Sequence, residues 1–550
     1  MDPNRLHRYR STAVDPQVLH EDPPLTVADL FRTQAETRPD APFLWYRDAG
    51  WTYGQVATQT RAFAVGLRKL GVEPGDRVAI VLPNWPEFAV AVLAASELGA
   101  TIVPLNPGYS TRELQYMLRN SEASLVITAE EHDGVDYLQL FETMLIDLPD
   151  LQYLVTVGEE DLWYDDRIFQ FEDVVSFGRG RELAPAKIES PHESFAILYT
   201  PGTMGTPKGV VLSHDNLVRT AVATAEKLGL REDVALCCVP LYHIFGLSAV
   251  LLTAVASGSA VVLQERFDAA GAFDLIERHG VTVFSGVPTM FVMSLRELDA
   301  NPRNLPTLRT GIVAGAPVAE DLACAVRERL VPELEIAYGL TETSPTVSIT
   351  QPSDPPAKRF QTVGKPIEGV ELEIRDSGGG PLPAESVGEL AIRGFNVMKG
   401  YFRQPTQTSG VLAADGFLKT GDLAMIDAEG YLHIVGRSSD VIIRGGYNVH
   451  PQEIEVLLRS HPAVEDAAVL GIPNDVLGEL VCACVKPVEG ALITAEELRG
   501  YVYESLADYK VPDRIQFMEE FPENTDERAR RVELARVVRV EEASGSGEPV

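Results

Sequence analysis

Cysteine is scarce in this sequence, and so are the patterns that would give it a structural role. There are five cysteines in 550 residues, and none forms a CxxC pair. A zinc site needs such closely spaced ligand pairs, so the sequence argues against one. Cys482 and Cys484 alternate inside the apolar run Val481–Val485, which is typical of a strand. We therefore expect buried, inert thiols, as in proteins of the reducing cytoplasm.

Long hydrophobic runs are also missing. The first ten residues, MDPNRLHRYR, lack the apolar segment of a secretory signal. The longest apolar stretch, Ile244–Leu263, is interrupted by Gly258 and by several Ser and Thr residues. A membrane span needs about 20 predominantly apolar residues. A buried helix followed by a strand explains this stretch better, so we expect no stable membrane insertion.

Basic residues are few relative to acidic ones. The chain has 47 Lys and Arg against 80 Asp and Glu, which gives a formal net charge of −33. A surface this acidic repels nucleic acid at long range, so we expect no nucleic acid partner. Small phosphate-bearing molecules are not excluded, because backbone amides and a few cations decide their binding locally.

The pattern that is present alternates short apolar runs with helical periodicity. Val78–Leu82 is predicted as a strand buried on both faces, Glu87–Leu98 as a helix and Thr101–Leu105 as the next strand. Similar strands are predicted at Leu125–Thr128, Phe195–Tyr199, Val261–Leu263, Val281–Phe284 and Gly311–Ala314. This alternation predicts α/β layers with mostly parallel sheets.

The pattern changes after Gln351–Gln361, a polar and proline-rich segment that we predict to be a loop. Shorter strands at Val370–Arg375, Gly388–Arg393 and Tyr431–Val435 then indicate a more β-rich lobe.

A small C-terminal domain is predicted to begin near Gly436-Arg437. Its first helix, Pro451–Ser460, should bury an apolar side made of Ile454, Val456, Leu457 and Leu458. Strands are expected at Ala467–Leu470, Leu480–Val485 and Arg514–Met518. Thr494 and Glu497 form a capping box that opens another helix. The tail EEASGSGEPV is predicted to be disordered.

A loop rich in glycine and hydroxyl groups follows the strand predicted at Phe195–Tyr199. Its sequence is Tyr199-Thr200-Pro201-Gly202-Thr203-Met204-Gly205-Thr206-Pro207-Lys208-Gly209. Backbone N–H groups, threonine hydroxyls and the Lys208 ammonium suit the wrapping of phosphates. It is not a Walker A loop, because the GK[ST] sequence is missing. On the loop alone, a plain surface turn is an equal alternative.

This loop resembles the phosphate loop of the adenylate-forming superfamily, which includes acyl-CoA synthetases, peptide-synthetase adenylation domains and luciferases. The family loop is usually written YTSGTTGxPKG, so Pro201 and Met204 each replace a hydroxyl-bearing residue, and Pro201 also lacks a backbone N–H. The resemblance implies that Lys208 and Thr203 are catalytic, and that Thr203 also lies near the metal. The further ATP contacts that it implies are Thr200, Gly202, Gly205 and Thr206.

Three further segments extend the resemblance around the nucleotide. Gly315-Ala316-Pro317 resembles the family segment that lies against adenine, where small residues permit close approach. In Tyr338-Gly339-Leu340-Thr341-Glu342-Thr343, the family places the Tyr near adenine, the Thr at phosphate and the Glu on magnesium, a cation that prefers carboxylate oxygen. Asp422 and Arg437 match residues that reach the ribose, with a structural ion pair as the alternative.

The acyl side is implied by a segment of mixed aromatic and apolar character. Pro240-Leu241-Tyr242-His243-Ile244-Phe245-Gly246 resembles the family segment that borders the acyl pocket. His243 would then lie near the carboxylate end of the substrate and take part in catalysis. A buried histidine with a purely structural role is the alternative. Val287–Met290 resembles a further wall of the pocket, and its apolar character suits an acyl or aryl chain.

The C-terminal motifs imply a domain that rotates between two half-reactions. Arg444-Gly445-Gly446 would line the pantetheine path of CoA, and Ser439 stands at the hinge position where the family has Asp or Lys. The family's last motif, PKTxxGKIxRREL, carries a lysine that bridges the substrate carboxylate and the α-phosphate. Arg528 takes its place here, and no lysine follows Lys510. We expect slower adenylation with thiolation less affected, because a planar guanidinium is not a compact point charge.

The resemblance implies an α/β protein with a large N-terminal domain of layered α/β sheets and a distorted β-barrel-like lobe, joined to a small mobile α+β domain. The expected limits are 1–436 for the AMP-binding domain, 437–440 for the hinge, 441–540 for the small domain and 541–550 for the tail.

The implied activity is that of a cytoplasmic acid–thiol ligase of fatty acid metabolism. It would use ATP and Mg²⁺ to activate a fatty or aryl carboxylic acid, and would transfer the acyl group to CoA. Loading of a carrier protein, or a non-catalytic paralogue that binds nucleotide or acyl-adenylate, are the alternatives. The oligomeric state stays open, with a homodimer as one option.

Overall fold

The structure of the chain, a computed structural model, describes residues 25–160, 162, 165–183, 190–200, 207–437, 441–488, 490–518, 521, 534 and 538. These residues divide into a large and a small compact unit. The large unit holds the described parts of Met1–Pro107, Gln115–Tyr199 and Gly209–Gly436. The small unit holds those of Gly108–Leu114, Thr200–Lys208 and Arg437–Val550.

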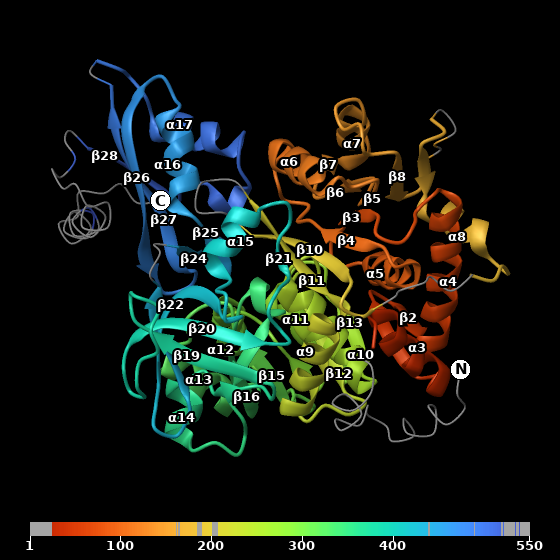
Figure 1. Cartoon of the computed structure of the whole chain (residues 1–550), viewed down its shortest axis with the longest axis horizontal. Helices are drawn as coiled ribbons and strands as arrows, with labels where there is room; N and C mark the ends of the chain where they lie inside the picture. The colour runs from red at the N-terminus through yellow and green to blue at the C-terminus, as the bar shows by residue number, and fades with distance from the viewer. Residues whose placement is uncertain are drawn as a thin grey trace. The chain divides into compact units, whose positions relative to one another are not determined.

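One sheet of the large unit is built on the strand–helix alternation predicted from the sequence (Figure 1). Its strands are β3 (Arg77–Val81), β4 (Thr101–Pro104), β5 (Leu125–Ala129), β8 (Tyr153–Val157), β9 (Ile168–Gln170), β10 (Ser194–Thr200), β11 (Lys208–Ser213) and β21 (Gly400–Tyr401). They lie in the order β21-β11-β10-β4-β3-β5-β8-β9. β3 pairs in parallel with β4 and β5, and nearly all of their residues are buried. This burial on both faces explains why these strands appear as continuous apolar runs.

A second sheet of the large unit is mainly parallel in its middle. Its strands are β1 (Pro42–Tyr46), β2 (Ala49–Thr52), β12 (Val234–Cys237), β13 (Ala260–Leu263), β14 (Val283–Phe284), β15 (Thr310–Val313), β16 (Glu333–Gly339), β17 (Thr346–Ile349) and β18 (Lys365–Pro366). They lie in the order β18-β17-β16-β15-β14-β12-β13-β1-β2. Phe273, Phe284 and Phe291 are fully buried in the core that packs against this sheet.

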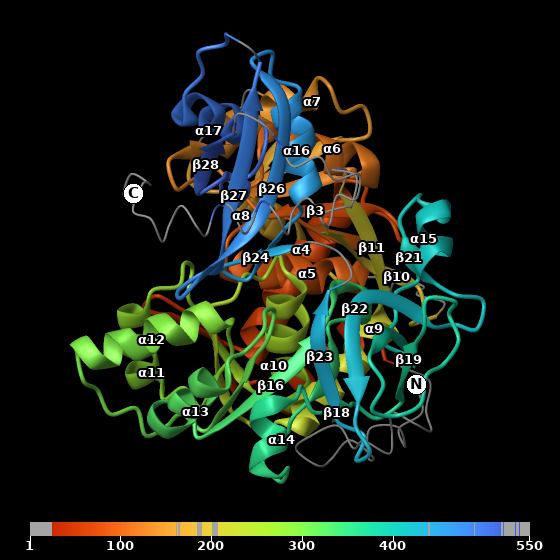
Figure 2. The same cartoon turned by 90° about the vertical axis from the view of Figure 1, so that its left-hand side faces the viewer.

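Helices cover the two sheets. They are α3 (Val27–Thr37), α4 (Tyr53–Lys69), α5 (Pro86–Leu98), α6 (Thr111–Ser121), α7 (Tyr137–Leu145), α8 (Phe171–Gly178), α9 (His214–Lys227), α10 (Thr253–Ser257), α11 (Ala269–His279), α12 (Pro288–Ala300), α13 (Glu320–Arg329), α14 (Pro356–Gln361) and α15 (Pro405–Val411). The short strands β6 (Glu131–His132) and β7 (Val135–Asp136) pair with each other. α12 contacts both α11 and α13 (Figure 2).

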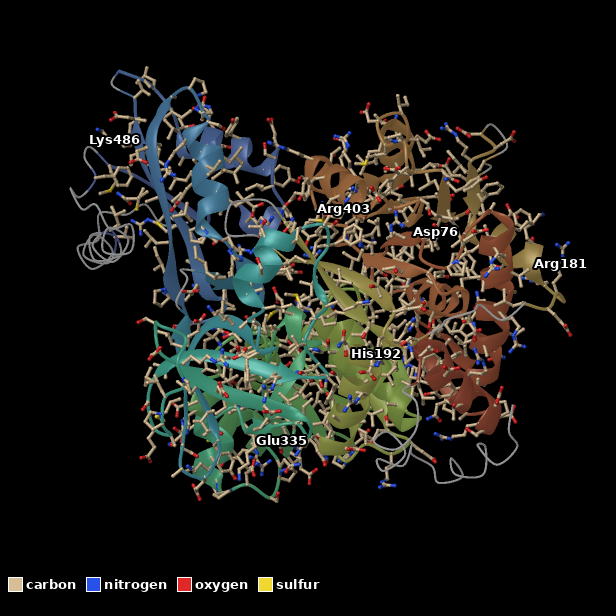
Figure 3. The ribbon with its side chains drawn as sticks, viewed as in Figure 1. Asp76, Arg181, His192, Glu335, Arg403 and Lys486 are labelled. Carbon is tan, nitrogen blue, oxygen red and sulfur yellow. The ribbon has the colours of Figure 1, made fainter. Side chains whose placement is uncertain are left out.

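The prediction of a loop over Gln351–Gln361 holds for residues 351–355 but is wrong from Pro356, where α14 begins. Proline suits the first turn of a helix, since its missing N–H has no partner there and its φ is already helical. Tertiary contacts then hold this short helix. Arg359 donates to Glu335 on β16 at 2.5 Å, and Glu335 is fully buried (labelled in Figure 3). Composition alone predicted a loop because these partners are distant in sequence.

The apolar stretch Ile244–Leu263 forms a buried helix and then a strand, as predicted. The helix starts with a π-helical segment, η1 (Phe245–Leu252), continues as α10 and ends at Gly258 in the left-handed conformation, with φ +67°. Strand β13 follows. Across the described residues, no helix combines the length and apolarity that crossing a membrane requires.

The β-rich lobe predicted after residue 361 is a further sheet of the large unit. Its strands are β19 (Val370–Arg375), β20 (Gly388–Gly394), β22 (Leu418–Ile426) and β23 (Leu432–Arg437), in the order β19-β20-β22-β23. β20 pairs antiparallel with both β19 and β22.

The small unit has the mixed helix and strand composition expected from the sequence. Its elements are β24 (Ile442–Arg444), β25 (Tyr447–Val449), α16 (Pro451–Arg459), β26 (Val464–Asn474), β27 (Gly478–Pro487), α17 (Ala495–Tyr503), η3 (Asp508–Lys510) and β28 (Arg514–Phe517). The capping box of Thr494 and Glu497 at the start of α17 is confirmed, with Glu497 N donating to Thr494 Oγ1 at 3.2 Å. An α/β protein with a large sheet-built N-terminal domain and a small C-terminal domain is therefore confirmed.

Two details of buried side chains differ from expectation. Ile454 and Leu458 of α16 are buried, but Val456 is 60% exposed and so does not belong to the buried side of the helix. The exposed position of Val456 follows from the helical period, which turns it about 200° from Ile454. Four cysteines are buried, whereas Cys324 is partly exposed. The disordered tail that we predict lies outside the described residues.

Candidate active site

Two of the segments predicted to contact the nucleotide leave the same edge of the second sheet. β15 and β16 are parallel, with Val313 opposite Ile336. The carboxyl ends of parallel strands meet at one edge, where α/β proteins commonly bind ligands. Gly315, Ala316 and Pro317 follow β15, and Gly315 has φ +87°. Tyr338 and Gly339 end β16, so both predicted nucleotide segments begin at this edge.

A hydrogen bond joins two of the predicted nucleotide residues. The Tyr338 hydroxyl donates to Oδ2 of Asp422 at 2.5 Å. Asp422 lies on β22, its side chain is buried, and its backbone N donates to Oγ1 of Thr420 at 3.0 Å. The bond therefore ties the edge of the second sheet to the smaller sheet. Sequence reasoning assigned both residues to the nucleotide, but it gave no indication that they contact each other.

Glu342, the predicted magnesium ligand, lies on a short 3-10 turn, η2 (Thr341–Thr343), directly after β16. Its side chain is half-buried and accepts a hydrogen bond at Oε1 from the Tyr401 hydroxyl at 3.0 Å. Its backbone O accepts from Met398 N at 2.9 Å. Thr341 opens the turn and is also half-buried. Tyr401 was not among the residues predicted from the sequence.

The backbone around this turn requires a glycine at position 339. A Cβ on Gly339 would lie 1.6 Å from the carbonyl oxygen of Pro345, far inside van der Waals contact. The Thr343 hydroxyl accepts from Leu340 N at 2.9 Å and so stabilises the turn from within. The spacing of Tyr338, Thr341 and Glu342 therefore depends on a close backbone approach that other residues would disrupt.

His243 lies between β12 and the π-helix η1. Its side chain is accessible to solvent, yet burial of the surrounding segment lowers the pKa of the imidazole to about 4. Nδ1 accepts a hydrogen bond from Phe245 N at 3.2 Å, so we assign the proton of the neutral ring to Nε2. Ser248, on the same helix, donates to the carbonyl oxygen of Ser344 at 2.8 Å. The segment that carries His243 is thereby tied to the segment that carries Glu342.

Asn84 is a positioning residue that sequence reasoning missed. It follows β3 and is 2% exposed. Its Nδ2 donates to the carbonyl oxygens of Val239 and Gln264, both at 3.0 Å, and its Oδ1 accepts from Leu241 N at 2.8 Å. The side chain thus fixes the backbone that leads to His243. A polar Asn inside the apolar context Val81–Trp85 is the signal that could have indicated this role.

The glycine-rich loop is described only at its ends. Thr200 ends β10 and Lys208 begins β11, and both side chains are half-buried. Gly202, Thr203, Gly205 and Thr206 lie outside the described residues, as do the departures Pro201 and Met204. Gly209 follows directly, and a Cβ there would meet Cγ2 of Ile197 at 2.7 Å. The start of β11 is therefore closely packed beside β10.

The small unit holds the residues predicted for the pantetheine path. Arg444 forms a two-pronged ion pair with Asp513, with Nε to Oδ2 at 2.8 Å and Nη2 to Oδ1 at 2.6 Å. Gly445 and Gly446 have φ +57° and +87°, which favours glycine at both positions. Ser439 and Arg528 lie outside the described residues, as does the side chain of Arg437.

The described ranges contain no group of three or more His, Cys, Asp or Glu residues that could hold a metal ion by themselves. This arrangement suits magnesium, which proteins commonly bind through one or two carboxylates together with substrate phosphates. Glu342 fits that role, because its carboxylate is partly accessible and is oriented by a neutral phenol.

Comparisons with known proteins identify the family of the chain. The family described as AMP-binding enzyme matches residues 31–402, and the AMP-binding enzyme C-terminal domain matches residues 453–527. A putative acyl-CoA synthetase, YngI of Bacillus subtilis, is 33% identical over 521 residues, which cover 90% of this chain and 94% of that protein. A feruloyl-CoA synthase from Amycolatopsis is 33% identical over 494 residues, which cover 89% of this chain and 94% of that protein.

Solved structures that resemble this chain also belong to synthetases. The amide bond synthetase McbA from Marinactinospora thermotolerans has a TM-score of 0.83 and 28% identity, covering 92% of this chain and 99% of that one. A double mutant of o-succinylbenzoate CoA synthetase from Bacillus subtilis has a TM-score of 0.78 and 30% identity. The match covers 90% of this chain and 96% of that one. With both the AMP-binding domain and its C-terminal domain matched, this chain belongs to the AMP-binding enzyme family of the adenylate-forming superfamily.

Proposed function

We propose that this protein is an ATP-dependent acid–thiol ligase. It activates a fatty or aryl carboxylic acid as an acyl-adenylate and transfers the acyl group to CoA. The observation that carries the proposal is that the two carboxylates predicted for the nucleotide and its metal, Asp422 and Glu342, are each oriented by a tyrosine hydroxyl. The acyl-CoA synthetase names of its relatives support the choice of acid and thiol as substrates.

In the first half-reaction, an oxygen of the substrate carboxylate attacks the α-phosphorus of ATP, and pyrophosphate leaves. Asp422 would accept hydrogen bonds from the ribose, and Lys208 would neutralise phosphate charge. Glu342 would hold magnesium, which when bound supplies positive charge to the phosphate oxygens. Catalysis of this kind is mainly positioning and charge stabilisation.

In this step, Nε2 of His243 would donate a hydrogen bond to the substrate carboxylate. The lowered pKa, about 4, keeps the imidazole neutral at physiological pH. With Nδ1 occupied by Phe245 N, the proton on Nε2 would orient the substrate carboxylate without neutralising it. In the second half-reaction, the thiol sulfur of CoA attacks the acyl carbon and AMP leaves.

The test is a substrate panel with the full chain, ATP and Mg²⁺. Medium-chain fatty acids and hydroxycinnamic acids are supplied with CoA, and pyrophosphate and acyl-CoA are measured. We expect both products with at least one acid class. Replacing CoA by a carrier protein's phosphopantetheine arm or by an amine tests the other acceptors. Binding of MgATP by calorimetry without pyrophosphate release would favour the non-catalytic paralogue, and absence of binding would refute the proposal.

We further propose that Arg528 slows adenylation. Loss of one well-placed donor to the transition state costs about 10²–10³ in rate. Arg528→Lys should therefore raise the rate of pyrophosphate release by about 10²-fold. Arg530→Lys, a neighbouring change of the same type, is the control and should have no such effect. No gain from Arg528→Lys, together with normal wild-type turnover, would contradict this proposal.

A further inference from the structure

We propose that Tyr401 is a positioning residue for magnesium, because its hydroxyl holds the carboxylate of Glu342 from β21, the strand that pairs with β11. This inference rests on the proposed function, since it needs Glu342 as the metal ligand. It adds a residue that the sequence motifs did not include. The evidence comes from the hydrogen bonds and strand register around residues 396–402.

The first step concerns the backbone of the Glu342 turn. Met398 N donates to the carbonyl oxygen of Glu342 at 2.9 Å. The Ser344 hydroxyl donates to the carbonyl oxygen of Asn396 at 2.8 Å. The middle of the turn and the residue that follows it are therefore both bonded to one short segment, residues 396–398. The position of Glu342 depends on that segment.

The same segment continues into β21 and joins the strand after the phosphate loop. Tyr401 lies opposite Val210 of β11 in antiparallel register. Lys399 N donates to the Val211 carbonyl oxygen at 2.9 Å, and Phe402 N donates to that of Gly209 at 2.7 Å. Figure 3 labels Arg403, two residues beyond Tyr401, which marks where this segment runs. The segment thus links the Glu342 turn to the strand that starts at Lys208.

The second step concerns the side chain. Tyr401 is 9% exposed, and its hydroxyl donates to Oε1 of Glu342 at 3.0 Å. A tyrosine hydroxyl ordinarily loses its proton only near pH 10, so at neutral pH this group is the donor of the bond and Glu342 is the acceptor. One such bond uses one of about four lone-pair sites of a carboxylate. The carboxylate keeps its charge and the remaining sites for a cation.

A neutral donor is the type of partner that this position requires. A lysine or arginine there would also orient Glu342, but its positive charge would repel magnesium at short range. A phenol fixes the rotamer without that repulsion. The backbone of Tyr401 is itself fixed, because Tyr401 N donates to the Thr408 hydroxyl at 2.9 Å. The hydroxyl is therefore held in place from β21.

The experiment measures ATP binding by calorimetry for the full chain, once with Mg²⁺ and once with EDTA. Tyr401→Phe removes only the hydroxyl and should weaken binding of MgATP by about tenfold, with little change in EDTA. Tyr53→Phe is the matched control, because it removes another buried hydroxyl of the large unit, which donates to the Ser259 carbonyl oxygen at 2.7 Å. It should leave both affinities unchanged.

A double variant separates positioning from general destabilisation. In a Glu342→Ala background, adding Tyr401→Phe should change neither the affinity in Mg²⁺ nor that in EDTA. Equal losses with and without Mg²⁺, or a further loss in the Glu342→Ala background, would overturn the role of Tyr401. Wild-type affinity of Tyr401→Phe for MgATP would overturn it as well. If the wild type itself bound no MgATP, the proposed function would fail, and the role of Tyr401 with it.

Discussion

The two units hold their predicted site residues in different ways. In the large unit, Asp422 and Glu342 are each bonded to a neutral phenol, from Tyr338 at 2.5 Å and from Tyr401 at 3.0 Å. In the small unit, Arg444 is bonded through two nitrogens to the carboxylate of Asp513. A phenol orients a carboxylate and leaves its charge intact, whereas an ion pair cancels the charge of its members.

Under the proposed function, this difference would separate groups that bind ligands from groups that support the fold. A carboxylate held by a phenol keeps the negative charge that a cation or a sugar hydroxyl requires. The guanidinium of Arg444 is occupied by Asp513, so its main effect should be to hold the glycine turn at Gly445 and Gly446. We therefore expect the pantetheine path to be shaped by the glycines more than by the charge of Arg444.

Buried ionisable groups away from the site show the same contrast. His214 of the large unit is 1% exposed, and burial lowers its pKa to about 4, so it stays neutral. Lys510 of the small unit is equally buried but remains charged, because Glu453 and Glu113, both in that unit, neutralise it at 3.0 and 2.5 Å. The carboxylates raise the pKa of Lys510 against the opposing effect of desolvation, which is the largest single influence.

The largest expected effect is the loss of stability of the small unit when Lys510 is replaced. Lys510→Met would leave two buried carboxylates without a cation and should destabilise the small unit by about 3–5 kcal/mol. All four tryptophans precede residue 164, within the sequence range of the large unit. Urea denaturation should therefore shift the circular dichroism transition of the small unit while the tryptophan fluorescence transition stays in place.

The control for Lys510 is Lys486→Met. Lys486 pairs with Glu465 at 2.7 Å, but both side chains are at least 30% exposed. Such pairs contribute about 0–1 kcal/mol. Equal effects of the two substitutions would mean that Lys510 does not hold the small unit together.

The next effect concerns the pH dependence of the stability of the large unit. The unfolded chain binds a proton at His214 with a pKa of about 6.5, while the folded chain does so only near pH 4. Protonation therefore favours unfolding, and stability should fall by about 3 kcal/mol as pH drops from 6.5 to below 4. His214→Gln should remove this part of the slope in urea denaturation by tryptophan fluorescence. An unchanged slope would contradict the neutral state of His214.

A smaller effect is expected from the nucleotide-side phenol. Tyr338→Phe removes one charged hydrogen bond from Asp422 and should weaken AMP binding by about tenfold in calorimetry. Tyr137→Phe is the control, because the Tyr137 hydroxyl donates to the Pro107 carbonyl oxygen at 2.8 Å and lies outside the predicted site residues. If Tyr338→Phe left the affinity for AMP unchanged, the contrast between carboxylates bonded to a tyrosine hydroxyl and the ion-paired Arg444 would have no functional meaning.

The smallest effect is expected from Arg444. Arg444→Lys keeps a positive charge but loses the two-pronged geometry, and the KM for CoA should change by less than about fivefold. Asp513→Asn is the complementary variant, since it frees the guanidinium. A much larger increase in KM with Arg444→Lys would indicate that CoA uses the guanidinium directly, and the comparison of the two units would have to be revised.

Much of the fold followed from local patterns. The apolar runs of β3, β4 and β5 and the capping box of Thr494 and Glu497 depend on residues close in sequence, so periodicity and spacing predicted them. Local patterns failed where distant partners decide. The helix at Pro356–Gln361 is held by Glu335, which is distant in sequence. The exposure of Val456, in contrast, follows from the helical period, which the sequence already contained.

The sequence by itself determined which motif residues were predicted for the site, because a short motif such as Tyr338–Thr343 states its residue types and spacing directly. Only the tertiary structure decided how those side chains are held. Tyr338 meets Asp422 across 84 positions, and Tyr401 meets Glu342 across 59. Hydrogen bonds between segments this distant leave no periodic trace in the sequence, because they arise only when separate elements of the fold come together.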